Sequence, residues 1–206
     1  MRFTLLLASW LCVPGALFAA DQFGESLHVK VGDGAELHCI VSGPINSDLT
    51  PIVFVPGYLM PADIYEFQLR HFAQHRRVVA IDPRSQGKST RVSHGHYPAR
   101  RAKDIKAVAD QLGLKRFVLV GWSLAVLEAL SFYDQFSAEN LQAHVFIDGD
   151  LSYEVPDQEA VREIRFLKMI TGVSQANRPE ALRSFARSVY KNPPPTEHLD
   201  RVTSSV

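Results

Sequence analysis

The stretch Val120-Gly121-Trp122-Ser123-Leu124-Ala125 places a serine between small residues, directly after an apolar run over residues 117–120. A serine on a sharp turn from strand to helix needs small residues two positions before and after it, because strand and helix approach closely there. Gly121 and Ala125 meet that requirement. The N-terminus of the helix that follows favours a developing negative charge. The stretch therefore predicts that Ser123 is a nucleophile.

The composition is that of an ordinary globular domain. The chain has 206 residues, of which 46% are hydrophobic and 21% charged. The 22 basic residues balance the 22 acidic ones, so no net charge draws the chain to nucleic acid or to an anionic membrane. We therefore expect no nucleic-acid partner.

Residues 1–20 have the pattern of a secretory signal peptide. Arg2 precedes an apolar stretch over residues 5–17, and Ala19-Ala20 form a small-residue exit. Pro14 interrupts the apolar stretch, which is too short to span a membrane, so no membrane span is expected once the signal is removed. A buried N-terminal strand or helix is the alternative. We predict a secreted or periplasmic protein that begins at Asp21.

Strands and helices alternate along the next part of the chain. Alternating apolar residues predict strands over 27–31 and 35–41, joined by a turn at 32–34, with Cys39 as a small buried residue. Apolar runs predict buried strands over 52–55, 78–81, 116–120 and 145–147. Helical patterns cover 63–74, 97–112 and 124–136. We predict an α/β fold with a mostly parallel sheet and helices on both faces.

The pattern changes after residue 150. Amphipathic helices are predicted over 156–170 and 178–190, and a further helix begins at Glu197 after the prolines of 193–195. We predict a core over 21–150 and a partial helical lid over 151–206.

Four loops that follow predicted strands carry polar or small residues. In a parallel sheet, ligands bind at the carboxyl ends of the strands. The loops are residues 56–58, 82–89, 121–125 and 148–150. Arg84 in the second loop is expected to tie neighbouring loops together and to take no part in catalysis.

Four segments, "VFVPGY" (53–58), "AIDPRSQGKST" (80–90), "VLVGWSLA" (118–125) and "VFIDGD" (145–150), occur in this order. With them the chain resembles the α/β-hydrolase fold family, and within it the bacterial serine esterases and non-haem haloperoxidase-like enzymes. The resemblance implies that Ser123 is the nucleophile and that the backbone N–H groups of Tyr58 and Leu124 form an oxyanion hole. Ala125 replaces the last glycine of the family motif, a departure that the family tolerates. The implied chemistry requires no metal and no organic cofactor.

A serine nucleophile also needs a base, usually a histidine oriented by a carboxylate. Only His144 and His198 follow Ser123. We expect His144 near the amino end of its strand, away from the site, and His198 exposed to solvent. Asp148 is the candidate acid, although the resemblance more often places the acid after a further strand. The absent base and strands lead us to expect a chain that is incomplete at its C-terminus.

The sequence therefore supports a secreted serine hydrolase that acts on an ester or similar acyl substrate, with water or peroxide as acceptor. The alternative is an inactive hydrolase-like protein that binds a ligand or partner. Dehalogenase chemistry uses an aspartate at the position of Ser123 and is disfavoured. Because the last predicted strand would be an exposed edge, we also expect residues 21–206 to be poorly soluble.

Overall fold

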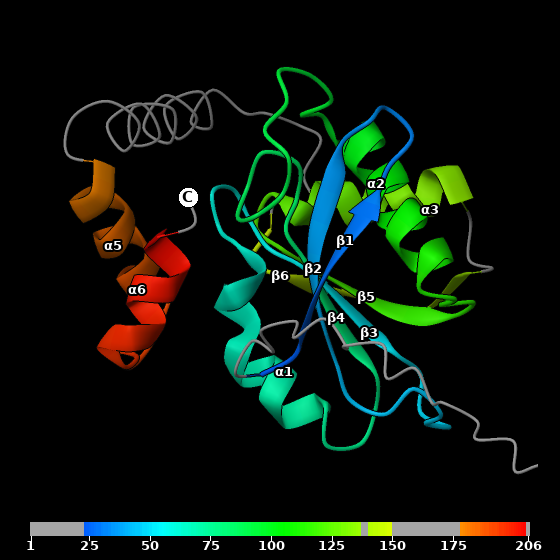
Figure 1. Cartoon of the computed structure of the whole chain (residues 1–206), viewed down its shortest axis with the longest axis horizontal. Coiled ribbons are helices and arrows are strands. Elements are labelled where there is room, and N and C mark those ends of the chain that lie inside the picture. The colour runs from blue at the N-terminus through cyan, green and yellow to red at the C-terminus, as the bar shows by residue number, and fades with distance from the viewer. Residues whose placement is uncertain (1–22, 137–139, 150–177, 205–206) are drawn as a thin grey trace, which may run out of the picture.

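The computed structural model describes residues 23–136, 140–149 and 178–204, which form a sheet flanked by helices (Figure 1). The strands are β1 Glu25–Lys30, β2 Glu36–Ser42, β3 Ile52–Val55, β4 Val78–Ile81, β5 Phe117–Trp122 and β6 Leu141–Ile147. The helices are the 3-10 helix η1 Ala62–Tyr65 and the α-helices α1 Glu66–Phe72, α2 Pro98–Gln111, α3 Ala125–Phe136, α5 Arg178–Ser188 and α6 Thr196–Ser204. The predicted α/β fold is confirmed.

The strands follow the spatial order β1-β2-β4-β3-β5-β6. Strands β4, β3, β5 and β6 are parallel, whereas β1 and β2 join the edge of the sheet in antiparallel pairs. The predicted turn between β1 and β2 contains Gly34 at a φ of 85°, a left-handed conformation that glycine adopts at little cost. The sheet is therefore mostly parallel, as the sequence predicted.

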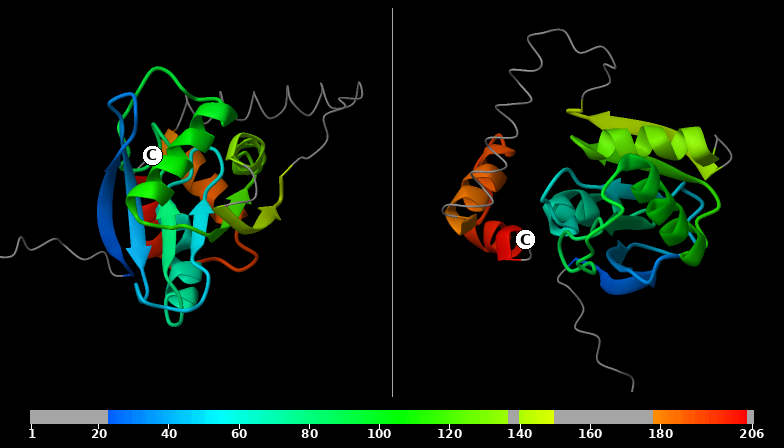
Figure 2. Two further views of the ribbon diagram at one scale, coloured as in Figure 1. Left: turned by 90° about the vertical axis from the view of Figure 1, so that its right-hand side faces the viewer. Right: turned by 90° about the horizontal axis from the view of Figure 1, so that it is seen from above.

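Helices cover both faces of the sheet (Figure 2). Val53 and Val55 of β3 pack with buried residues of α2 and α3, while Ile52 and Phe54 pack with buried residues of η1, α1 and α6. All four residues of β3 are buried, which explains why this strand has a continuous apolar sequence. Cys39 is also fully buried, as predicted, and burial raises the pKa of its thiol.

The prediction that His144 lies near the amino end of its strand was wrong. Strand β6 begins at Leu141, and His144 lies in its middle, opposite Leu119 of β5. Backbone pairing with β5 extends the strand beyond the apolar run of residues 145–147. The polar side chains that precede this run remain at least partly exposed, so they do not prevent the pairing.

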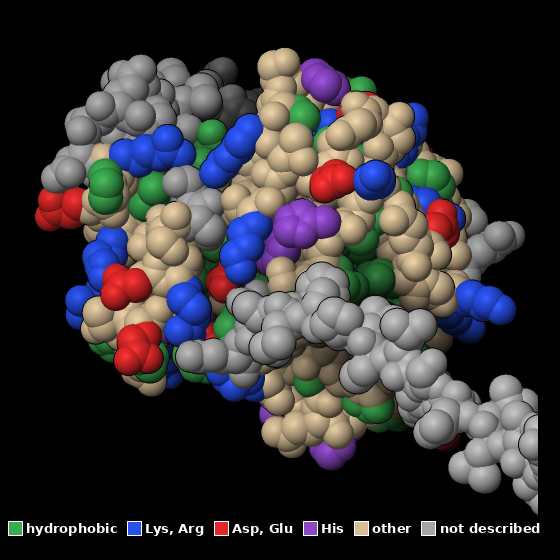
Figure 3. Space-filling view, viewed as in Figure 1, with side chains coloured by type: hydrophobic (Ala, Val, Ile, Leu, Met, Phe, Trp, Pro, Cys, Tyr) green, Lys and Arg blue, Asp and Glu red, His purple; other side chains and the backbone are tan. Residues whose placement is uncertain are grey.

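Two of the predicted C-terminal helices are present as α5 and α6, which pack against each other. Leu199 and Val202 of α6 are buried in the cluster that also contains Met60 and Ile64. Figure 3 shows Lys and Arg side chains interspersed with Asp and Glu side chains over α5 and α6. The helix predicted over 156–170 and the signal peptide predicted over 1–20 lie outside the described residues. Within the described ranges, no helix combines the length and apolar character that crossing a membrane requires.

Candidate active site

Ser123 lies on a tight turn between β5 and α3. Its φ is 55°, in the left-handed region, where a residue other than glycine is held only by its surroundings. The N–H of Ser123 donates to the carbonyl oxygen of Ile147 at 2.8 Å, and the N–H of Val126 donates to the carbonyl oxygen of Ser123 at 3.0 Å. The first bond connects the turn to the end of β6, and the second lies at the start of α3.

The residues around Ser123 must be small because neighbouring atoms lie close to their backbone. A Cβ atom on Gly121 would lie 2.6 Å from the carbonyl oxygen of Ala125. A Cβ atom on Gly57 would lie 3.0 Å from the Cβ and 3.5 Å from the Oγ of Ser123. The loop that follows β3 therefore touches the serine directly.

Gln86 holds the loop that contains Gly57 and Tyr58. The Gln86 side chain accepts from the N–H of Leu59 at 2.8 Å and donates to the carbonyl oxygens of Gly57 and Met60 at 3.3 and 3.2 Å. Among the described residues, the N–H groups of Tyr58 and Leu124 take no part in the hydrogen bonds of these loops. The role of these two N–H groups as an oxyanion hole stays a prediction.

Arg84 has the structural position that the sequence predicted. Its fully buried guanidinium donates to both carboxylate oxygens of Asp104 on α2, at 2.6 and 2.7 Å, and to Asp33 in the β1–β2 turn at 2.9 Å. The loop after β4 is thereby fastened to two neighbouring elements.

A hydrogen-bonded serine–histidine–aspartate array, which the sequence did not reveal, spans β1, β2 and the loop after β4. Ser26 Oγ is 2.7 Å from His38 Nε2, and His38 Nδ1 is 2.8 Å from Asp82 Oδ2. Asp82 also accepts from the backbone N–H groups of Ala62 and Lys88. The aspartate therefore holds η1 and the loop after β4 in place. Ser26 and His38 lie on neighbouring strands and Asp82 follows a third strand, so no local motif in the sequence marks this array.

The expectation that His198 is exposed was wrong. His198 on α6 is buried, with Nδ1 2.8 Å from Glu66 Oε2 and Nε2 2.5 Å from the Tyr190 hydroxyl. Glu66 also accepts from Arg70 at 2.9 Å and from Arg201. The proline-rich context suggested exposure, but the partner that buries His198 lies 132 residues earlier.

Asp148 follows Ile147 directly, at an exposed position with a φ of 48°. It thus lies beside the residue whose carbonyl holds the turn of Ser123. His144 packs against the rings of Tyr133 and Phe146, and burial lowers its pKa. Within the described residues, no histidine is hydrogen-bonded to Ser123.

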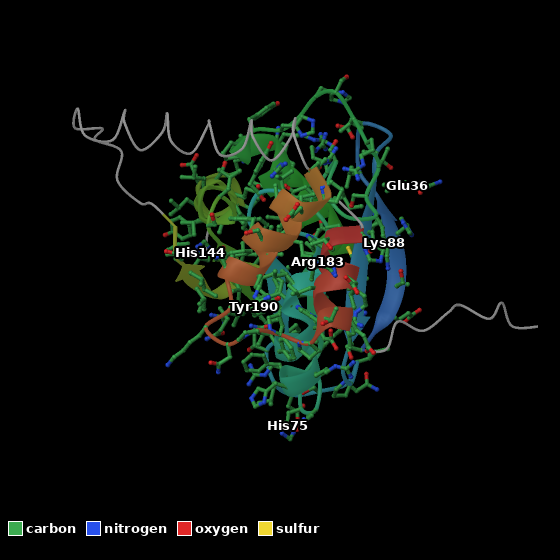
Figure 4. All side chains as sticks on the ribbon, turned by 90° about the vertical axis from the view of Figure 1, so that its left-hand side faces the viewer. Glu36, His75, Lys88, His144, Arg183 and Tyr190 are labelled. Atoms are coloured by element: carbon green, nitrogen blue, oxygen red, sulfur yellow. The ribbon has the colours of Figure 1, made fainter. Side chains whose placement is uncertain are left out.

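A pocket of about 180 Å³ opens beside this turn, between the ends of β5 and β6, the start of the α1 region and the segment after α5. Its apolar wall is formed by Ile64, Tyr65, Trp122, Ile147 and Val189. Gln68 and Tyr190 supply polar groups, and Figure 4 shows Tyr190 on the segment that follows α5. Two of the lining residues neighbour the serine: Trp122 precedes Ser123 in the chain, and the carbonyl oxygen of Ile147 accepts from the N–H of Ser123.

The sequence profile of the alpha/beta hydrolase fold family matches residues 50–188. The chain belongs to the alpha/beta hydrolase fold family. This match includes the loops around Gly57 and Ser123, so the resemblance seen in the sequence is confirmed.

Relatives of this alpha/beta hydrolase include haloperoxidases and esterases. The non-heme chloroperoxidase of Burkholderia pyrrocinia is 36% identical over 97 residues, which are 47% of this chain and 34% of the relative. The bifunctional esterase/perhydrolase DCH of Acinetobacter calcoaceticus is 35% identical over 123 residues, which are 59% of this chain and 44% of the relative. The chain thus matches less than half the length of either relative.

The fold also matches solved structures. The esterase RhEst1 from Rhodococcus sp. ECU1013 has a TM-score of 0.71 and 20% identity, and the match covers 87% of this chain and 67% of that one. At this level of identity the likeness supports the fold alone.

Proposed function

We propose that this alpha/beta hydrolase cleaves an ester or similar acyl substrate with Ser123 as the nucleophile. The observation that carries the proposal is the left-handed φ of Ser123 on the turn between β5 and α3. Such strain in a residue other than glycine concentrates at functional sites, where the fold holds a reactive group in position. The contact with Gly57 adds support, because it brings a second loop to the serine.

In the proposed reaction, Ser123 Oγ attacks the acyl carbon and gives up its proton to a base. The carbonyl oxygen becomes an oxyanion, which accepts hydrogen bonds from the N–H groups of Tyr58 and Leu124. The alcohol leaves with a proton, and water then attacks the acyl-enzyme and regenerates the serine. Loss of one such donor typically raises the barrier by about 3 kcal/mol.

Asp148 is proposed as the carboxylate that orients the base. The base itself has no assignment among the described residues. His38 and His198 use both ring nitrogens in other hydrogen bonds, and His144 lies in the middle of β6. The second candidate function is therefore an inactive hydrolase-like protein that binds an acyl ligand without turnover.

Peroxide can replace water as the acceptor in the same scheme. The name of the Acinetobacter relative, an esterase/perhydrolase, supports this variant. Residues 1–20 support export of the protein from the cytoplasm.

Labelling with a fluorescent fluorophosphonate tests the proposal. We expect the wild-type chain to be labelled, Ser123→Ala to lose the label, and Ser26→Ala to keep it. Turnover of 4-nitrophenyl acetate is measured in parallel. Labelling without turnover would favour the binding protein, and an unlabelled wild-type chain would contradict the role of Ser123.

A further inference from the structure

Glu66, His198 and Tyr190 form a hydrogen-bonded chain that is buried at Glu66 and His198 and ends at Tyr190 in the pocket lined by Trp122 and Ile147. Glu66 Oε2 lies 2.8 Å from His198 Nδ1, and His198 Nε2 lies 2.5 Å from the Tyr190 hydroxyl. Tyr190 in turn lines the pocket. The chain joins α1, the segment after α5, and α6, so three separate elements fix the position of one hydroxyl group.

The charges around Glu66 determine the direction of these hydrogen bonds. The guanidinium groups of Arg70 and Arg201 already donate to the carboxylate of Glu66, which accepts from all its partners, so Nδ1 of His198 is a donor as well. With Nδ1 as the donor to Glu66, the Nδ1–H tautomer of His198 accepts at Nε2 from the Tyr190 hydroxyl. Burial raises the pKa of Glu66, but hydrogen bonds from His198 and the two arginines outweigh it and keep that pKa below its usual value.

In this arrangement the Tyr190 hydroxyl donates its proton to His198 Nε2, so the lone pairs of its oxygen are available to a ligand. The carbonyl oxygen of Ile64 lies 3.5 Å from the hydroxyl, too far to compete with His198 for its proton. Tyr190 is thus a hydrogen-bond acceptor in a pocket whose wall is otherwise largely apolar. Burial also raises the pKa of Tyr190, so the phenol stays protonated at neutral pH.

The pocket has the size of a single ring. Its volume is about 180 Å³, and an apolar protein cavity of about 150 Å³ holds benzene. Tyr65 and Trp122 provide aromatic surface for such a ring.

We propose that this pocket binds a small neutral molecule with one aromatic ring and a hydroxyl or N–H group, which donates a hydrogen bond to Tyr190. His198 and Glu66 are positioning residues that act through Tyr190. That the ligand is part of an acyl substrate of Ser123 rests on the proposed function, whereas its binding can be measured without turnover.

Phenol and toluene are matched probes, because a methyl group replaces the hydroxyl at similar size. The chain has two tryptophans, so Trp10→Phe leaves the indole N–H of Trp122 as a single NMR signal for titration. In this background we expect phenol to bind about tenfold more tightly than toluene. Tyr190→Phe should abolish the preference without changing the affinity for toluene, and the exposed Tyr133→Phe should leave both affinities unchanged.

Two variants of His198 test its positioning role. His198→Gln keeps an amide near the position of Nε2 and should retain part of the phenol preference, whereas His198→Leu should abolish it. If Tyr190→Phe weakened the affinity for phenol and for toluene equally, Tyr190 would only pack against the ligand, and the proposal would be overturned. Failure of the wild-type chain to bind either probe would also overturn it.

The labelling of Ser123 separates this proposal from the proposed function. Fluorophosphonate labelling without selective phenol binding would overturn the pocket proposal alone. Selective phenol binding without labelling would leave the pocket proposal standing and overturn the role of Ser123.

Discussion

Gly57 and Ser123 lie in direct contact, although they follow different strands. A Cβ atom on Gly57 would stand 3.0 Å from the Cβ of Ser123 and 3.3 Å from the carbonyl oxygen of Trp122. The parallel pairing of Val55 with Gly121 brings the two loops to the same edge of the sheet. Because Gly57 has no Cβ atom, the proposed oxyanion loop can lie this close to the proposed nucleophile.

Gly57→Ala should slow the labelling of Ser123 by a fluorophosphonate about tenfold or more. The added methyl group must push either the serine or the loop aside by a few tenths of an ångström, and a displacement of that kind misaligns the attacking oxygen. The labelling rate is measured together with thermal unfolding, which separates a local effect from loss of the fold.

Gly32→Ala is the matched control. A Cβ atom on Gly32 has no neighbour within 4 Å, so this variant should label at the wild-type rate. Equal labelling rates for Gly57→Ala and Gly32→Ala would show that the contact does not position the serine.

The turn of Ser123 could be predicted because its causes are local. A buried strand such as β3 needs an apolar run, and a close strand-to-helix turn needs small residues two positions on either side of the serine. Both requirements appear within a few consecutive residues. The predicted strand over 52–55 accordingly matches β3, Ile52–Val55.

The environments of the histidines could not be predicted, because their partners are distant in the chain. His38 lies 44 residues before Asp82, and His198 lies 132 residues after Glu66. Each histidine is buried by the packing of elements whose relative positions are known only from the fold. The proline-rich context in the sequence therefore gave the wrong exposure for His198.

Asp82→Ala should lower the free energy of unfolding by about 3 kcal/mol or more. The carboxylate accepts from His38 and from the backbone N–H groups of Ala62 and Lys88, and its removal leaves buried donors without partners. Urea unfolding monitored by circular dichroism measures the change.

Asp110→Ala is the control, because Asp110 is exposed and forms an ion pair with Lys106. Its effect should stay within about 0.5 kcal/mol. A loss below about 1 kcal/mol for Asp82→Ala would contradict the view that this aspartate holds η1 and the loop after β4.

Stability should fall as the pH drops from about 4 towards 2. Burial raises the pKa of Asp33, but hydrogen bonds from Arg84 and Ala35 outweigh it, so the pKa falls from 3.8 to about 2. The unfolded chain therefore binds more protons than the folded chain in this range, and stabilisation present above pH 4 is lost as the pH approaches 2. Asp33→Asn should lose less stability over this range than the wild-type chain, as measured by urea unfolding at pH 5, 4, 3 and 2. A parallel loss in both proteins would show that Asp33 does not contribute.

The outer edge of β6 should limit solubility. Val145 and Ile147 are 41% and 42% exposed, and β6 is the last strand in the spatial order of the described sheet. A strand edge with exposed apolar side chains pairs readily with other chains, and a lysine on that edge opposes such pairing. Val145→Lys should therefore raise the concentration at which the purified protein stays monodisperse by light scattering.

Ile45→Lys separates edge pairing from general hydrophobicity. Ile45 is 75% exposed, more than Val145, but it lies in the loop between β2 and β3 and not on a strand. If strand pairing causes the association, Ile45→Lys should raise solubility much less than Val145→Lys, despite removing a more exposed side chain. Equal gains in the two variants would instead assign the association to exposed apolar surface, without a role for the backbone of β6.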